Sequence, residues 1–288
     1  MRELSISLVV FAASLFAADR SVDPTFLFRQ LSKVAPKAAD VSGQKCEYRP
    51  LFAEGDSEAR IARGVARYGE ITVRAGGAST PVSYPREEQI YYVVSGSGKV
   101  LYGDETQAVR PGDFMYLAPA VKHGLSTDGP APLKAIVMGF KIPQNKEIPA
   151  PGKLQKANAD EVKKQVVGNH PPSTLFQLMI GDVKSTRDRI AAGLTVTSLF
   201  IMEFAVGGTN FPHHHDREEE IYLLLDGTGD MVAGPGMDGV EGKFPAKPGD
   251  AYFYRLNTTV GFYNKKGGDS KIARILAVRS LYPFGDRP

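Results

Sequence analysis

Residues 207–222 read GGTNFPHHHDREEEIY, and this stretch holds three of the chain's five histidines followed closely by three successive glutamates. Neutral imidazoles together with a carboxylate are ligands that zinc, iron, manganese and nickel accept. The alternation of apolar and polar residues around the run is typical of a strand. On a strand His213 and His215 face the same way and His214 faces the opposite way. The stretch therefore predicts a two-histidine edge that a glutamate on the next strand completes into a metal site.

The composition is that of an ordinary globular chain. It has 288 residues, 42% of them hydrophobic and 23% charged, and a net charge of +3. This hydrophobic content is enough for a packed core. The small net charge and the lack of any Lys/Arg run predict that the protein binds no nucleic acid. The single cysteine, Cys46, rules out an intrachain disulfide and is expected to be a small buried residue.

The first 18 residues resemble a secretory signal. Arg2 precedes an apolar run over 4–16, and small residues follow at Ala17 and Ala18. This pattern predicts a secreted or periplasmic protein, the alternative being an amphipathic or core N-terminal segment. The run is short for a membrane span and no other apolar run approaches its length, so no stable membrane insertion is expected.

Short strands separated by turn signals dominate the rest of the chain and predict an all-β fold, a sandwich or a barrel. A short helix is expected around Thr25–Ser32, after Pro24. Residues 143–173 are rich in proline and enclose a charged piece, 154–167, that is expected to form one helix. We interpret 19–142 as an N-terminal domain, 143–173 as a linker with a short helix, and 174–288 as a C-terminal domain.

The two domains repeat one another. At an offset of 131 residues, turn and strand markers of the second half coincide with those of the first; the aligned pairs include Gly207 with Gly76, Glu219 with Glu88, Ile221 with Ile90 and Gly227 with Gly96. Pro248-Gly249-Asp250 matches Pro111-Gly112-Asp113 at an offset of 137, so the second copy carries six extra residues within the loop 234–242. That loop is either a mobile lid or a plain hairpin loop. Two copies indicate tandem domains.

At these residues the chain resembles the cupin superfamily, and specifically a bicupin. The first cupin motif is matched position for position by Gly207, His213, His215, Glu220 and Gly227. The second motif is matched only at its ends, by Gly249 and Asn264, and Val260 stands where the family has a histidine. The resemblance covers roughly 60–140 and 190–280.

The first copy departs in the opposite way. Val82, Tyr84 and Gln89 occupy the two histidine positions and the glutamate position, whereas His123 stands where the second motif has its histidine. His123 is expected to be a polar residue in a metal-free pocket, hydrogen-bonded to Gln89 or Tyr84. His170, in the linker, is expected to be an ordinary loop residue.

The resemblance implies two tandem cupin barrels (double-stranded β-helix or jelly-roll), each with its ligand site inside the barrel. It implies that His213, His215 and Glu220 bind one divalent transition metal (Fe, Mn, Ni or Zn), with Glu218 as the alternative carboxylate. Arg255 and Tyr254 are the candidate catalytic residues. Arg255 either clamps a carboxylate substrate or lies on the surface as an edge-strand residue, and Tyr254 shares a face with Tyr252.

Two functions are consistent with these residues. The first is a metal-dependent enzyme of the oxygenase, isomerase or hydrolase type that acts on a small polar molecule in the C-terminal barrel. The second is a non-catalytic ligand-binding or storage-like bicupin. The three-ligand set favours the enzyme, with a small molecule as its partner and a homodimer as a further expectation. A transcription regulator would need a DNA-binding helical domain, and the pattern contains none.

Overall fold

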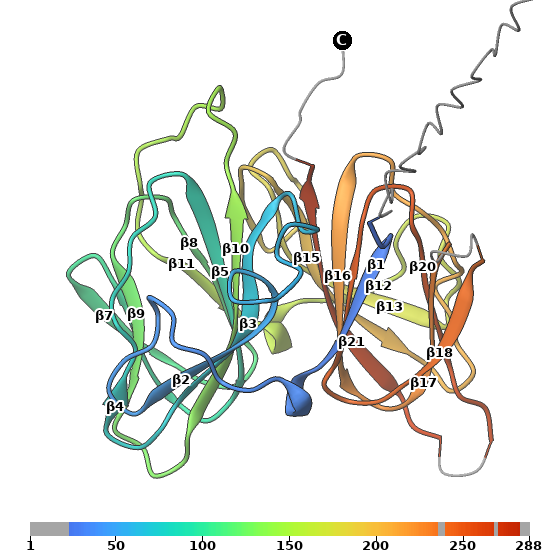
Figure 1. Cartoon of the computed structure of the whole chain (residues 1–288), viewed down its shortest axis with the longest axis horizontal. Coiled ribbons are helices and arrows are strands. Elements are labelled where there is room, and N and C mark those ends of the chain that lie inside the picture. The colour runs from blue at the N-terminus through green and yellow to red at the C-terminus, as the bar shows by residue number, and fades with distance from the viewer. Residues whose placement is uncertain (1–22, 236–239, 268–269, 283–288) are drawn as a thin grey trace, which may run out of the picture.

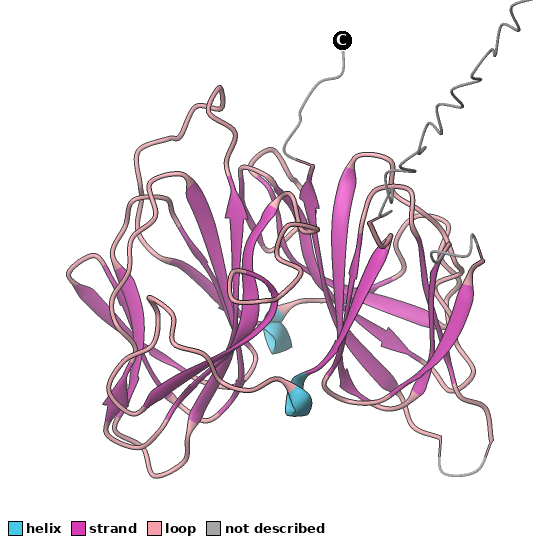
Figure 2. Ribbon diagram, viewed as in Figure 1, coloured by secondary structure: helices cyan, strands magenta, loops and turns pink. Residues whose placement is uncertain are grey.

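The structure is a computed structural model that describes residues 23–235, 240–267 and 270–282. The expected signal peptide, 1–18, lies outside these ranges. Within them nearly every element is a strand, and the only helical elements are two 3₁₀ turns, η1 (Leu31–Lys33) and η2 (Ala159–Glu161) (Figure 2). The all-β prediction is confirmed. No described helix is long and apolar enough to span a bilayer.

Two β-barrels lie side by side (Figure 1). The N-terminal barrel joins a six-stranded sheet, in the order β11-β8-β5-β10-β3-β2, to a four-stranded sheet, in the order β4-β9-β6-β7. Its strands are β2 (Cys46–Ala53), β3 (Val65–Val73), β4 (Gly77–Ala78), β5 (Glu87–Ser95), β6 (Gly98–Tyr102), β7 (Glu105–Val109), β8 (Asp113–Leu117), β9 (His123–Thr127), β10 (Leu133–Lys141) and β11 (Gln155–Asn158).

The C-terminal barrel has the same plan. Its large sheet runs β1-β19-β16-β21-β15-β13-β12, with β14 beside β13, and its small sheet runs β18-β17-β20. Its strands are β1 (Phe26–Gln30), β12 (Lys164–Gln165), β13 (Thr174–Asp182), β14 (Ile190–Gly193), β15 (Val196–Phe204), β16 (Glu218–Asp226), β17 (Gly229–Gly234), β18 (Gly242–Ala246), β19 (Asp250–Tyr254), β20 (Thr259–Asn264) and β21 (Ala273–Leu281).

Each barrel receives a strand from the segment that precedes the other barrel. β1, at the start of the chain, pairs with β19 of the C-terminal barrel (Figure 1), and β11, in the linker, pairs with β8 of the N-terminal barrel. Both helices expected from the sequence are therefore wrong. The region Thr25–Ser32 is mostly the strand β1, and 154–167 contains β11, η2 and β12. Pairing with a distant strand outweighs the weak local preference for helix in both segments.

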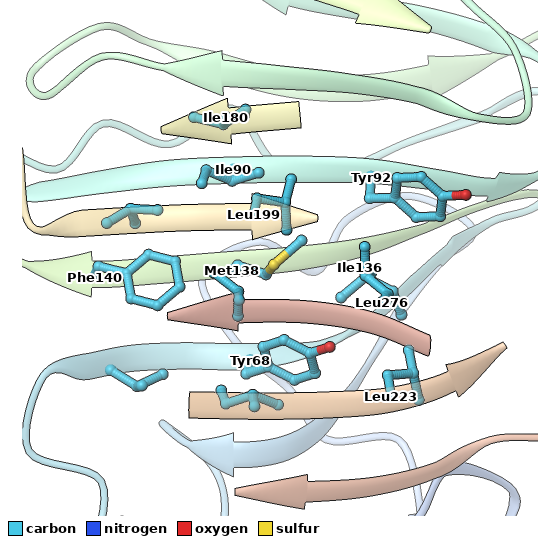
Figure 3. Packing of buried hydrophobic residues seen from close by; sticks show 14 of the residues in the cluster. Tyr68, Ile90, Tyr92, Ile136, Met138, Phe140, Ile180, Leu199, Leu223 and Leu276 are labelled. Atoms are coloured by element: carbon cyan, nitrogen blue, oxygen red, sulfur yellow. The ribbon is translucent and has the colours of Figure 1, made fainter. Parts of the chain in front are cut away.

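The two large sheets also form the contact between the barrels. Alternate residues of their strands point into the barrel or toward the neighbouring sheet, because side chains on a strand alternate between faces. Residues of β10 and β21 that face the interface are Ile136, Met138, Phe140, Leu276 and Val278. Residues of the same strands that face their own barrel interiors are Ala135, Val137, Ile275 and Ala277. Figure 3 shows side chains from both barrels packed in this shared core.

Two buried glutamates at equivalent positions connect the barrels in a reciprocal way. The Glu88 carboxylate accepts hydrogen bonds from the backbone N–H groups of residues 194–196 in the C-terminal barrel, at 2.6–2.7 Å, and one from the Tyr116 hydroxyl. The Glu219 carboxylate accepts hydrogen bonds from the backbone N–H groups of residues 63–64 in the N-terminal barrel, at 2.9 and 2.7 Å. We call these bonds the glutamate clasp.

Candidate metal centre

Two histidines of the opening stretch are held together at the mouth of the C-terminal barrel. His213 forms a two-bond bridge with Val260, N–H to O distances being 3.0 and 2.8 Å, and the His215 carbonyl accepts a bond from the Asn257 N–H at 2.7 Å. These contacts fix an extended loop rather than a regular strand. The two imidazole centroids lie 5.0 Å apart with an angle of 88° between the rings, whereas His214 is exposed.

The direction of each glutamate follows from the alternation of β16. Tyr222 and Leu224 pack inside the barrel, so Glu220 also faces the interior. Glu219 faces the other barrel and belongs to the glutamate clasp. Glu218 lies on the same face of β16 as Glu220, two residues earlier and nearer the barrel mouth, where it is half-buried.

The ligand atoms of His213, His215 and Glu220 all lie within 4.8 Å of one another, and no other group of this kind occurs in the described ranges. The Nε2 atom of His215 is 3.3 Å from the Glu220 Oε2 atom, and both atoms are buried without a hydrogen-bond partner. A cation bound to nitrogen and oxygen at about 2.0–2.2 Å brings its ligands to roughly this separation. Because buried polar atoms need a partner, the three side chains fit a divalent transition metal.

Charged neighbours orient His215 from behind. Its Nδ1 atom lies 3.7 Å from the Glu218 Oε2 atom, and the same oxygen is 3.3 Å from Arg279 Nη1. Burial acts to lower the pKa of His215, but the adjacent, negatively charged Glu220 carboxylate outweighs it and raises that pKa. Glu218 thus lies beside the His215 ring nitrogen that faces away from Glu220, a position from which a carboxylate fixes ring orientation in metal sites.

The His213 ring is oriented by a backbone carbonyl rather than by a charged side chain. Its Nδ1 atom lies 2.8 Å from the Phe211 carbonyl oxygen, so the Nδ1–H group donates and Nε2 is the free acceptor. Burial is the largest effect on this ring and lowers its pKa. A neutral imidazole with a free Nε2 atom is the form that binds a metal.

These residues line a cavity of about 110 Å³ in the C-terminal barrel. Its apolar wall includes Phe176, Phe200 and Met202, and Arg279 and Ser198 add polar groups near the ligand cluster. The Arg279 Nε atom and the Ser198 hydroxyl are buried and have no hydrogen-bond partner. The cavity therefore offers unsatisfied polar atoms to a bound molecule.

The two residues named from the sequence as catalytic lie elsewhere. Tyr254 faces the barrel interior, but its ring is fully buried beside Tyr222 and its hydroxyl points to the Val232 carbonyl at 3.4 Å. Arg255, the next residue, faces outward, and its guanidinium contacts the Pro24 carbonyl at 3.4 Å. Neither lines the cavity that contains the ligand cluster.

Two residues that the sequence reasoning missed do line this cavity. Arg279 follows the interior residues Ile275 and Ala277 at the period of a strand, a signal that was present in the sequence. His170 comes from the linker, and its ring centroid lies 5.4 Å from that of His213. His170 lies in a loop, as expected, and outside the cluster of His213, His215 and Glu220, but the fold of the linker, which no local pattern reveals, brings it to the cavity.

The N-terminal barrel has the same backbone geometry at the position equivalent to the candidate metal centre, but it lacks the three candidate ligand side chains there. Val82 and His123 form the same two-bond bridge as His213 and Val260. The His123 ring lies with its Nδ1 edge against the backbone and is hydrogen-bonded to the Val121 carbonyl at 2.8 Å. The expected hydrogen bond to Gln89 or Tyr84 is therefore wrong.

An arginine lies inside the N-terminal barrel. The buried Arg67 guanidinium bonds the Asp40 carboxylate at 2.7 Å and that of Glu54 at 2.9 Å, and it stacks 4.1 Å above the Tyr84 ring. Arg67 pairs with Gly139 across the sheet of the N-terminal barrel. In the C-terminal barrel the equivalent pair is Ser198 with Arg279, so Arg67 occupies the position of Ser198. In the N-terminal barrel this place is therefore taken by a guanidinium that is already paired with carboxylates.

Comparison with known proteins agrees with this architecture. Residues 69–139 match the family described as "Cupin domain". No curated protein matches the chain significantly.

Several solved structures share the fold over nearly the whole chain. A glyoxylate-induced protein from Pseudomonas aeruginosa, itself described as putative, superposes with a TM-score of 0.72 at 14% identity, covering 94% of this chain and 95% of that one. Protein YlbA from E. coli gives 0.64 at 17% identity, with coverages of 91% and 94%. A mutant of Bacillus subtilis oxalate decarboxylase gives 0.60 at 13% identity, with coverages of 89% and 76%. At such identities the likeness concerns the fold alone.

Proposed function

We propose that this chain, which belongs to the cupin superfamily and folds as a bicupin, is a metal-dependent enzyme acting on a small organic acid in its C-terminal barrel. The observation that carries the proposal is the convergence of His213, His215 and Glu220 with the Arg279 guanidinium at one cavity. Three protein ligands leave coordination positions for water or substrate, and Val260 adds no fourth ligand.

The charges around the cavity favour an anionic substrate. Arg279 and Arg187 line it, and the carboxylates nearby are Glu218, Glu220 and Asp188, the last paired with Arg187. The two guanidiniums and a divalent cation together exceed the three negative charges, so the site attracts an anion. Arg279 is the group we expect to hold the carboxylate, because a guanidinium binds a carboxylate through two parallel hydrogen bonds.

The size and lining of the cavity set the remaining features of the substrate. A volume of about 110 Å³ accommodates only a few non-hydrogen atoms. Buried apolar side chains, among them Phe176 and Phe200, line part of the cavity wall. Solved structures that share this fold include proteins named oxalate decarboxylases, but the size class proposed for this chain rests on its own cavity.

A divalent transition metal bound here would supply Lewis-acid polarisation of a substrate oxygen, and in the case of iron also oxygen chemistry. The chain's own groups hold and orient the acid. Arg279 neutralises the carboxylate, and Glu218 keeps both Arg279 and His215 in place through contacts of 3.3 and 3.7 Å. The apolar wall lowers the local dielectric, which strengthens each of these interactions.

Elemental analysis of the purified protein, before and after reconstitution with Fe, Mn, Ni and Zn, tests the first step. We expect close to one metal ion per chain. Each metal form is then incubated with a panel of small carboxylic acids, and products are followed by NMR to assign oxidative cleavage, isomerisation or hydrolysis. Finding no metal under any condition would refute the proposal, and metal with ligand binding but no turnover would support the ligand-binding alternative.

A further inference from the structure

His170 is held at the cavity by contacts that no loop motif explains. Its ring lies 4.9 Å from the Phe176 ring and 5.4 Å from the His213 ring, measured between centroids, and it lines the cavity of the metal centre. The histidine belongs to the segment between the barrels, immediately before Pro171 and Pro172. A linker residue therefore contributes to a site otherwise built from the C-terminal barrel.

The position of this ring is fixed through Asn210. His170 Nδ1 lies 2.7 Å from the Asn210 carbonyl oxygen. The Asn210 side chain is buried and bonds both the Tyr222 hydroxyl, at 3.1 Å, and the Phe262 N–H, at 2.9 Å. A second bond, from the Thr174 hydroxyl to the neighbouring carbonyl at 209, joins the same two segments at 2.8 Å. His170 is thus attached to a rigid part of the barrel.

These contacts also define which ring nitrogen is free. A ring nitrogen that faces a carbonyl oxygen must carry the proton, so Nδ1–H donates to Asn210 and Nε2 of the neutral ring is an acceptor. Among the described residues, none hydrogen-bonds this Nε2 atom. His213 has the same arrangement, but its Nδ1 atom faces the carbonyl of the next residue in the chain, Phe211. Two adjacent carbonyls therefore fix two imidazoles in the same tautomer.

His170 differs from His213 in its relation to the ligand cluster. Within the described part of the chain, only His213, His215 and Glu220 have ligand atoms mutually within 4.8 Å, and His170 is outside that group. Its free acceptor is therefore available to the molecule that occupies the cavity rather than to the ion.

We infer that His170 is a specificity residue that accepts a hydrogen bond from a hydroxyl group of the substrate, and that the substrate is a small hydroxy acid. The inference rests on the proposed function and deepens it. Arg279 binds the carboxylate, and the His170 acceptor requires a donor elsewhere on the same small molecule. The positive charges of the metal and the arginines disfavour an ammonium group as that donor, which leaves a hydroxyl. An oxo acid of the same size offers His170 no proton.

The experiment compares lactate with pyruvate, which differ by a hydroxyl in place of an oxo group, by titration calorimetry on metal-loaded protein. His170→Asn retains a donor near the Nδ1 position but lacks the Nε2 acceptor, whereas His170→Gln extends an amide toward that acceptor position. His214→Asn is the matched control, because His214 is the exposed histidine of the run 213–215. Metal content is measured for every variant by elemental analysis.

We expect the lactate-to-pyruvate affinity ratio to fall about tenfold in His170→Asn, the loss of one hydrogen bond, and to be partly restored in His170→Gln. The ratio is expected to be unchanged in His214→Asn, and metal content is expected to remain close to one ion in all variants. An unchanged ratio in His170→Asn overturns the inference and leaves the metal enzyme standing. Loss of metal in that variant makes His170 a ligand and also overturns it, as does wild-type protein that holds metal but binds neither acid. Failure of the wild type to take up metal removes the proposed function and this inference with it.

Discussion

The glutamate clasp gives the sharpest stability prediction. Glu88 is buried at the contact between the barrels, and its two carboxylate oxygens divide five hydrogen bonds. Oε1 accepts from the backbone N–H groups of Thr195 and Val196 and from the Thr195 hydroxyl, and Oε2 accepts from the Leu194 N–H and the Tyr116 hydroxyl. Glu88→Gln keeps the shape of the side chain and replaces one acceptor oxygen by a donor.

The cost of Glu88→Gln follows from these bonds. With the amide oxygen at the Oε1 position, the amide NH₂ faces the Leu194 N–H, and a buried donor without a partner costs about 1–3 kcal/mol. The three bonds to the Oε1 position change from charge-assisted to neutral and weaken by about 1 kcal/mol each, whereas the Tyr116 hydroxyl can turn to accept a bond from the amide NH₂. The smaller burial penalty of an uncharged amide offsets part of this loss. We expect a net destabilisation of about 3 kcal/mol.

Chemical denaturation and thermal melting of the metal-free protein measure this effect. A loss of about 3 kcal/mol corresponds to a fall in Tm of roughly 6–12 °C. The equivalent change Glu219→Gln also leaves one backbone N–H unsatisfied but weakens fewer charge-assisted bonds, so it is expected to cost less, about 2 kcal/mol. Glu105→Gln, on an exposed residue of β7, is the control and should change the free energy of unfolding very little. A Glu88→Gln variant within about 1 kcal/mol of wild type would refute the reasoning.

The remaining predictions concern the two barrel interiors. His215→Ala should abolish metal binding in an elemental analysis, and His123→Ala should leave it unchanged; loss of metal in the second variant would assign the ion to the other barrel. Val260→His places an imidazole opposite His213, as His123 stands opposite Val82, and should tighten metal binding at least about tenfold in a competition titration with a chelator; an unchanged affinity would contradict this placement. Burial lowers the pKa of His123 to about 4 from an ordinary value near 6.5, so the unfolded chain takes up a proton first as the pH falls. The stability that depends on neutral His123 is then present above pH 6.5 and is lost toward pH 4, by about 3 kcal/mol; His123→Gln should flatten the pH dependence of unfolding in that window, and an equally steep profile would contradict it. Arg279→Gln should raise the KM for an acid substrate roughly 10-fold to 100-fold while Arg255→Gln leaves it unchanged, and equal effects in steady-state kinetics would disprove the assignment.

Much of the fold could be predicted because the two copies repeat turn and strand markers. The equivalence of Val82 with His213 and of His123 with Val260, inferred from offsets of 131 and 137 residues, reappears as two identical bridges. The resemblance to the cupin motif implied the set His213, His215 and Glu220, and the structure brings these three residues together. Their role as ligands stays a prediction.

Which of two neighbouring residues faces the barrel interior could be decided only from the strands with which they pair. Tyr254 and Arg255 are consecutive, so only one of them can face the barrel interior, and the period of a strand already excluded both acting in one cavity. Which of them faces inward depends on the pairing of β19 with β16, where Glu220 stands opposite Tyr254. His170 gave no signal at all, because its place depends on contacts between the linker and a loop that lies 40 residues further along the chain.

The exchange of β1 between the barrels has a consequence for how the protein is made. Gln30 of β1 bonds Asp250, 220 residues later, whereas Asn158 of β11 bonds Asp113 only 45 residues away. At about 5–20 residues per second, β1 leaves the ribosome roughly 10–45 s before its partner strand exists. The N-terminal barrel can close during synthesis with β11, while the first segment of the chain must wait for the last barrel. Folding of the C-terminal barrel therefore ends with β1 joining a strand that is made 220 residues later.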